Sequence, residues 1–364
     1  MQTMLSHTET ARADQLQFLR FLAFMNIFIW HAEAWNFFCY PAGNSGNFAV
    51  SFFFVMSGLV TGYAHYGRER KPTLRNIGWD MWKRICKIYP LYFLTMMLPV
   101  LNSSFPEWIA TGNWEEMAPE LDQLLKNLLL IQSWFRKGHF TFNIVGWFMS
   151  TLLFLNLFNL PVLYVLNRLD KRRNRYGIFI LSIAVVSFFA FFYCGLTRGL
   201  SLRFWHYVFP PARMGEYLAG MILGFGIKSF LRTNLPEKIP VSVYTVAEIG
   251  ALGLWWIYLH WWGTYWTTQS VHWLLPNLIL LCVFTFGGGL VSRLFHWKPL
   301  VYLGDISFEC YLIHELIVMR YEIKHNWTVV SAMDQVVAFL YCLMITILAA
   351  SLFHRTKKQR QQVY

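Results

Sequence analysis

The stretch Arg20-Phe-Leu-Ala-Phe-Met-Asn-Ile-Phe-Ile-Trp-His31 is an apolar run with a cation at one end and a histidine at the other. At about 100° per residue, the two side chains are close to three helical turns apart, so they share one face of a helix. They stand about 16 Å apart along its axis. In a bilayer Arg20 would lie near one surface and His31 well inside. Because an ionisable group at that depth is costly, the sequence indicates a functional His31.

The composition around this stretch is that of an integral membrane protein. Hydrophobic residues make up 56% of the 364 residues and charged residues only 14%, and the mean hydropathy is +0.38. The net charge of +12 fits basic cytoplasmic loops. No basic stripe alternates with exposed aromatic residues, so we expect no nucleic-acid binding. The six cysteines lack metal-ligand spacing, and most lie in apolar runs as small packing residues. We therefore expect neither a metal site nor a disulfide framework.

The fold class that follows is an all-α polytopic membrane protein with ten transmembrane helices. Residues 1–15 are polar, so we expect no cleavable signal peptide. We expect residues 1–364 to form one membrane-embedded domain without repeats. Apolar runs of spanning length occur at about 16–38, 48–64, 85–101, 145–166, 176–194, 210–230, 239–262, 271–291, 300–320 and 329–353. The third of these is short and interrupted by Pro90 and Pro99.

The charges of the loops predict the orientation of these spans. On one side lie Arg12, Arg68, Arg70, Lys71, Arg75, Lys83, Arg84, Arg168, Lys171, Arg172, Arg173, Arg175, Lys228, Arg232, Lys238, Arg293, Lys298, Arg355, Lys357, Lys358 and Arg360. On the other side lie only Lys126, Arg136, Lys137, Arg198, Arg203 and Lys324. The positive-inside rule therefore predicts that both termini are cytoplasmic. The longest outer segment, 102–143, contains an amphipathic part that would lie along the membrane interface.

Two groups of residues are candidates for chemistry, one around His31 and the other around Arg20. His31 is the candidate base, and Glu33, two residues later, points to another side of the helix and serves either function or solvation. Arg84 and Lys87 share a helix face at the cytoplasmic end of the third span. With Arg20 they would form a cationic collar suited to phosphate groups. The structural alternatives are a snorkelling Arg20, an interhelical hydrogen bond from His31, and an ordinary basic flank.

Other polar residues within the apolar runs can be explained by packing or pairing, and the sequence does not decide whether they also have a functional role. The Ser57-Gly58 step fits close helix packing, and no nucleophile elbow surrounds Ser57. Arg213 and Glu216 are three residues apart and could pair with each other. Asp305, Glu309 and His314 lie within the ninth run, where His314 could form a hydrogen bond between helices.

These motifs, taken in order, resemble the membrane acyltransferase 3 family. The matching elements are Arg20-x10-His31, Phe-Phe-x-x-Ser57-Gly58, Arg84-x-x-Lys87 before Ile-Tyr-Pro-Leu-Tyr, Pro-Ala-Arg213-Met-Gly-Glu-Tyr-Leu-Ala-Gly220, and Leu303-Gly-Asp-Ile-Ser-Phe-Glu-Cys-Tyr-Leu-Ile-His314. The resemblance implies a ten-helix bacterial inner-membrane enzyme that moves an acyl group, usually acetyl, from cytoplasmic acyl-CoA to a sugar hydroxyl. Two departures stand out. Lys87 replaces the commoner arginine, and Trp147-Phe-Met-Ser-Thr-Leu152 lacks the family's acid, so the carboxylate that assists the histidine stays unassigned.

The reaction implied by the resemblance fits the spacing of these residues. Arg20, Arg84 and Lys87, joined by Arg213, would hold the phosphates of acetyl-CoA, the only cofactor-like molecule we expect. His31 would act as general base or as a covalent acyl relay, with Ser57, Glu216 and His314 in support. The partners expected are the acyl-CoA, a glycan or glycolipid acceptor, and membrane lipids. The alternative is a transporter or flippase for a lipid-linked glycan, although the sequence contains no inverted repeat.

Overall fold

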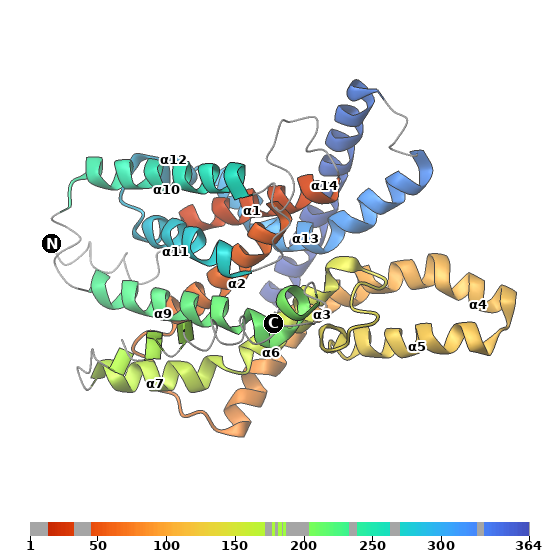
Figure 1. Cartoon of the computed structure of the whole chain (residues 1–364), viewed down its shortest axis with the longest axis horizontal. Helices are drawn as coiled ribbons and strands as arrows, with labels where there is room; N and C mark the ends of the chain where they lie inside the picture. The colour runs from red at the N-terminus through yellow and green to blue at the C-terminus, as the bar shows by residue number, and fades with distance from the viewer. Residues whose placement is uncertain are drawn as a thin grey trace.

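The computed structural model describes residues 14–32, 45–171, 204–232, 239–262, 270–325 and 331–363, with a few short pieces between 177 and 186. These residues are almost wholly helical and include no strand, in agreement with the all-α prediction. The helices are α1 Asp14–His31, α2 Ser45–Ala64, α3 Leu74–Pro99, α4 Phe105–Thr111, α5 Trp114–Leu128, α6 Trp147–Asn156, α7 Asn159–Lys171, α9 Met214–Leu231, α10 Val241–Trp262, α11 Ser270–Phe286, α12 Leu290–Phe295, α13 Lys298–His325 and α14 Ala332–Val363 (Figure 1).

Helices occur where the apolar runs predict them, except that most of the fifth run, 176–194, lies outside the described residues. Four helices among the described residues are long and apolar enough to cross a membrane: Gly46–Ala64, Leu74–Thr111, Val241–Trp261 and Met333–Thr356. The pair α6 and α7, bent by 43°, would make a fifth. The ten spans and the cytoplasmic termini therefore remain predictions. The charged residues that α13 carries inside its apolar run lower its hydropathy.

The third span is longer than the predicted 85–101, and its prolines do not break it. The helix begins at Leu74, passes Pro90 and Pro99, and continues through a π-helical segment, Val100–Ser104, into α4 as one element of 38 residues. The wider π turn directly after Pro99 accommodates the change of register that a proline imposes. At about 1.5 Å per residue the element is about 57 Å long.

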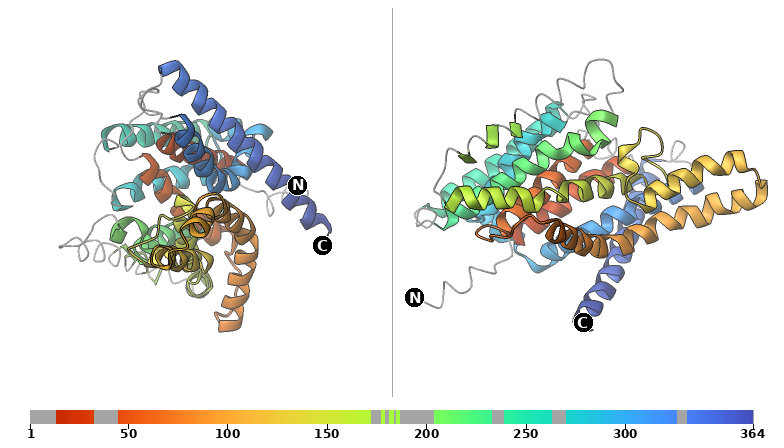
Figure 2. Two further views of the ribbon diagram at one scale, coloured as in Figure 1. Left: turned by 90° about the vertical axis from the view of Figure 1, so that its right-hand side faces the viewer. Right: turned by 90° about the horizontal axis from the view of Figure 1, so that it is seen from below.

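The outer segment 102–143 forms a helical hairpin with the end of this long element. Gly112, in the left-handed region at φ 58°, ends α4, and the side chain of Asn113 caps α5 by accepting from the Glu115 amide. Trp108 Nε1 donates to Glu120 Oε2 at 3.1 Å and joins the two helices. Both figures of the whole chain show α4 and α5 side by side, standing away from the other helices (Figures 1 and 2).

The closest helix contact lies between α2 and α9, and glycines make it possible. A Cβ atom on Gly58 or Gly62 would lie 1.9 or 2.0 Å from a backbone oxygen of α9. A Cβ atom on Gly220 or Gly224 would lie 2.0 Å from a backbone oxygen of α2. Each helix thus carries a Gly-x-x-x-Gly face, which lets two backbones approach closely. The packing reading of the Ser57-Gly58 step is correct for Gly58.

The first helix lies against α13, and this contact positions the candidate site. A Cβ atom on Gly304 of α13 would lie 2.0 Å from the backbone oxygen of Gln17, so the two helices touch near their beginnings. Gln15 donates to the backbone oxygen of Phe284, 2.9 Å away, and ties α1 to α11. The two helices run in the same direction, so the end of α1 arrives beside the middle of α13.

Candidate functional site

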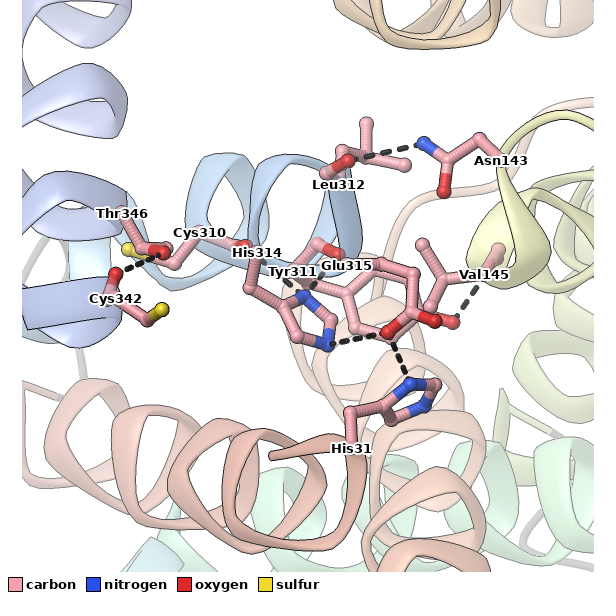
Figure 3. Close-up of polar contacts among 10 residues, drawn as sticks. All are labelled: His31, Asn143, Val145, Cys310, Tyr311, Leu312, His314, Glu315, Cys342 and Thr346. Atoms are coloured by element: carbon pink, nitrogen blue, oxygen red, sulfur yellow. Dashed lines mark hydrogen bonds and ion pairs between the residues drawn. The ribbon is translucent and has the colours of Figure 1, made fainter. Parts of the chain in front are cut away.

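The centre of the site is an ion pair between His31, the last residue of α1, and Glu315 of α13. The Nδ1 atom of His31 contacts Oε2 of Glu315, and both side chains are largely buried, with 11% and 6% exposure. Figure 3 shows the two side chains pointing toward each other from their helices. Because the pair uses Nδ1, the Nε2 atom of His31 is the ring nitrogen left to meet another molecule. Glu315 holds the ring in place by accepting from Nδ1.

His314 completes the cluster from the same turn of α13. Its Nδ1 lies 2.8 Å from the backbone oxygen of Tyr311. Since a carbonyl oxygen can only accept, Nδ1 carries the proton and donates it. Its Nε2 lies 4.0 Å from Glu315 Oε2 and has no hydrogen-bond partner among the described atoms. The His31 and His314 rings meet edge to face, with centroids 5.1 Å apart.

The same three side chains have the composition of a metal-binding group. His31, His314 and Glu315 offer one ligand atom each, and these atoms lie within 4.8 Å of one another. Two imidazoles and a carboxylate form a donor set that suits a divalent transition metal. From the sequence we expect no metal, since the six cysteines lack metal-ligand spacing, and His31 lies too far along the chain from His314 and Glu315 for a spacing to indicate this group. The geometry fits either a hydrogen-bonded dyad or such a site.

A cavity of about 460 Å³ opens beside His31, and we call it the histidine cavity. Its lining comes from Ile27, Trp30, His31, Gly46, Val50, Phe140, Ile144, Val145, Trp147, Tyr207, Tyr311, Glu315 and Glu322. The lining is mostly aromatic and aliphatic, with His31 and two carboxylates as its ionisable groups. A few polar groups in an apolar hollow are typical of small-molecule sites.

A second cavity, of about 340 Å³, contains the arginines, and we call it the arginine cavity. Its lining comes from Gln17, Arg20, Phe53, Met56, Ser57, Val60, Thr61, Ala64, His65, Arg84, Phe148, Leu152, Phe308 and Tyr311. Arg20 also donates to Gln17 Oε1 at 2.9 Å, which orients its guanidinium. The two arginines, from α1 and α3, lie around one hollow, as the predicted collar requires.

The two cavities follow each other along the same helices. On α1, Arg20 lines the arginine cavity and His31 lines the histidine cavity. On α2, which runs in the reverse direction, Ser57 lines the arginine cavity and Val50 lines the histidine cavity. The helices α6 and α13 likewise contribute one part to the arginine cavity and another part to the histidine cavity. Of the described residues, only Tyr311 lines both cavities. The Arg20 to His31 line is therefore a path with a cavity at each end.

Of the other predicted site residues, Arg213, Glu216 and Lys87 lie outside this path, whereas Ser57 lies on it. Arg213 is completely buried and pairs with Glu216, with 3.0 Å between Nη1 and Oε2, so the pairing read from their spacing is correct. Arg213 thus forms its ion pair with Glu216, and it lines neither cavity. Lys87 is exposed on α3 and does not line the arginine cavity. Ser57 lines that cavity, but its hydroxyl donates to Phe53 O of its own helix at 2.7 Å.

One carboxylate was missed, and one predicted carboxylate cannot be placed. Glu33 lies outside the described residues. Glu315 directly follows the motif that ends at His314 and was not singled out. Its signal was present, because an acid inside an apolar span is a functional candidate by itself. Its pairing with His31 across 284 positions of sequence has no local pattern that could have indicated it.

Comparison with known proteins gives one match. Residues 14–355 match the family of acyltransferase domains called Acyl_transf_3. The matched range includes α1 with His31, α13 with Glu315, and both cavities. Neither a curated protein nor a solved structure matches the chain.

Proposed function

The chain belongs to this acyltransferase family, and from that premise we propose that it transfers an acetyl group from cytoplasmic acetyl-CoA to a hydroxyl group of a glycan or glycolipid. The family supports a membrane acyltransferase activity in general. The donor, the acceptor, and a place in a bacterial inner membrane are our proposal. It rests above all on the His31–Glu315 pair in the wall of the histidine cavity.

The pair has the arrangement of a general base and its orienting carboxylate. Glu315 binds Nδ1 of His31, so Nε2 is available to take a proton from the acceptor hydroxyl. The acceptor oxygen then bonds to the carbonyl carbon of the thioester, and the carbon–sulfur bond breaks. The proton on His31 passes to the leaving thiolate of coenzyme A. Glu315 stabilises the imidazolium between these steps, since an ionic hydrogen bond is stronger than a neutral one.

The arginine cavity supports the choice of an acyl-CoA donor. Arg20 and Arg84 could pair with the phosphates of coenzyme A, because guanidinium groups bind phosphate oxygens with two donors. The thin pantetheine arm would extend from there toward Tyr311. A distance of about 16 Å from Arg20 to His31 suits that arm. The charged head would stay at the cytoplasmic side, where the positive-inside rule predicts Arg20 to lie.

The histidine cavity supports a sugar as acceptor. Trp30, Trp147 and Tyr207 provide aromatic surface, onto which the apolar face of a sugar ring can pack. Glu322 provides a carboxylate that can accept hydrogen bonds from sugar hydroxyls.

Labelled acetyl transfer in membranes tests this function. Membranes that contain the protein, supplied with acetyl-labelled acetyl-CoA and a cell-surface glycan extract, should incorporate label into glycan. His31→Ala and His31→Gln should each lower the rate by about 10²–10⁴-fold at equal protein level. A chelator should leave the rate unchanged, since we expect no metal.

Three other outcomes would discriminate between the alternatives. Near wild-type transfer by His31→Gln would make His31 a packing residue and contradict the mechanism. Glycan movement across the membrane without any incorporated label would favour a transporter. Label that accumulates on the protein would favour the acyl-imidazole route over direct transfer.

A further inference from the structure

The arginine cavity and the histidine cavity meet at one side chain. Tyr311 lines both, and Phe148 and Phe53 line the arginine cavity at the same level. The Tyr311 ring lies 5.5 Å from the Phe148 ring and 6.2 Å from the Phe53 ring, measured between centroids. The three rings therefore lie together where the arginine cavity approaches the histidine cavity.

The position of the Tyr311 ring is determined by contacts at both of its ends. Its hydroxyl donates to the backbone oxygen of Val145 at 3.1 Å, and its helix turn carries His314 and Glu315. The side chain is 5% exposed. Figure 3 shows the ring lying beside Glu315, with its hydroxyl directed toward Val145. The hydrogen bond joins α13 to the segment just before α6, so the ring spans the gap between two elements that line the cavities.

We propose that Tyr311 is the partition between the donor and acceptor cavities and that it determines the length of the acyl group transferred. This inference rests on the proposed function and adds its acyl specificity. Any acyl group that reaches His31 from the arginine cavity must pass this ring. With the thioester carbonyl at His31, the acyl carbons beyond it lie in the histidine cavity against the Tyr311 ring, where an acetyl group adds one methyl and a longer chain needs space that this ring fills. Close-packed rings cannot admit extra methylenes without moving, so longer chains should react slowly.

Acyl-chain selectivity tests the inference. The measurement is the ratio of kcat/KM for hexanoyl-CoA to that for acetyl-CoA, in purified wild type, Tyr311→Ala and Tyr311→Phe. This ratio does not depend on how much of each sample is folded, because the active concentration cancels. Tyr311→Ala should raise the ratio by about tenfold or more, in the range that methylene-sized differences in a pocket produce. Tyr311→Phe keeps the ring and should keep a ratio close to that of wild type.

Tyr217→Ala is the matched control. Tyr217 is also a buried tyrosine with a hydrogen-bonded hydroxyl, donating to Asn159 Oδ1 at 2.6 Å, but it lines neither cavity. It should lower stability without changing the ratio. An unchanged ratio in Tyr311→Ala, with acetyl transfer intact in wild type, would overturn the partition alone. Absence of acyl transfer from every acyl-CoA in wild type would overturn the proposed function and this inference with it.

Discussion

At the scale of single residues, the chemistry depends on a base and a carboxylate from different helices. His31 ends α1, and Glu315 lies near the middle of α13. A histidine alone in this position would lose a defined tautomer and ring orientation. Paired with a carboxylate, it has both, and it lines the histidine cavity. The contribution of Glu315 should therefore be measurable separately from that of His31.

Glu315→Gln should lower acyl transfer by about 10²–10⁴-fold while the protein stays folded. The amide has the same size but cannot stabilise the imidazolium that forms when His31 takes a proton. The measurement is the transfer rate at equal membrane level. Glu309→Gln is the control, because Glu309 is also a buried glutamate of α13 near a histidine, His354, but lies outside both cavities. Equal losses in the two variants would argue against a specific role for Glu315.

Arg84→Ala should raise the KM for acyl-CoA by about 10- to 100-fold, the cost of a lost charge-assisted contact. The KM for the acceptor should stay the same, because Arg84 lines the arginine cavity and not the histidine cavity. Lys83→Ala removes a neighbouring exposed cation that packs on Trp79, 5.1 Å from its ring centroid. It should leave both constants unchanged. A change confined to the acceptor would mean that Arg84 serves another ligand.

The sequence predicted the residues of the site unevenly, and distance along the chain explains why. Arg20 and His31 share one helix, so their alignment follows from helical geometry alone. The pairing of Arg213 with Glu216 follows from a spacing of three, which also argues against a phosphate role for Arg213. The His31–Glu315 pair depends on how α1 packs against α13, which no local pattern encodes.

At the scale of helices, the glycine contact with α9 fixes the position of α2, which is one wall of the arginine cavity. Four glycines allow the backbones to touch, and larger side chains would force them apart. The spacing of Gly58 with Gly62 and of Gly220 with Gly224 was visible in the sequence. Only the structure shows that the two faces meet each other. The prolines of α3 were misread for a related reason, because tertiary contacts maintain a helix that propensity alone would end.

Gly220→Ala should destabilise the protein by about 1–3 kcal/mol, the usual range for overpacking. Its Cβ would lie 2.0 Å from the backbone oxygen of Val55, which cannot move independently of α2. Gly226→Ala is the control on the same helix, since a Cβ there would have nothing within 4 Å. Melting temperatures of the purified proteins in detergent compare the two. Similar melting of both variants would show that the α2–α9 contact tolerates separation.

At the scale of the whole molecule, the order of the cavities gives the reaction a direction. The arginine cavity is lined near the start of α1 and the histidine cavity near its end. If loop charge sets the orientation, the donor enters from the cytoplasm and the acceptor meets His31 from the outer side. Loop charge predicts the orientation, which remains a prediction, and the projecting hairpin of α4 and α5 was not predicted. Its contacts, such as that of Trp108 with Glu120, join two helices, and no local sequence pattern indicates that these helices pair.

The orientation is itself testable by labelling from outside the cell. A single cysteine in place of Lys126, in α5 of the hairpin, should react with a membrane-impermeant maleimide. One in place of Lys71, in the connection between α2 and α3, should react only after the membrane is opened, because that loop is basic. The six native cysteines, of which Cys86 is exposed, need replacement by serine beforehand. Labelling of position 71 and protection of position 126 in intact cells would reverse the orientation. The arginine cavity would then face outward, away from cytoplasmic acyl-CoA, and the proposed direction of transfer would be wrong.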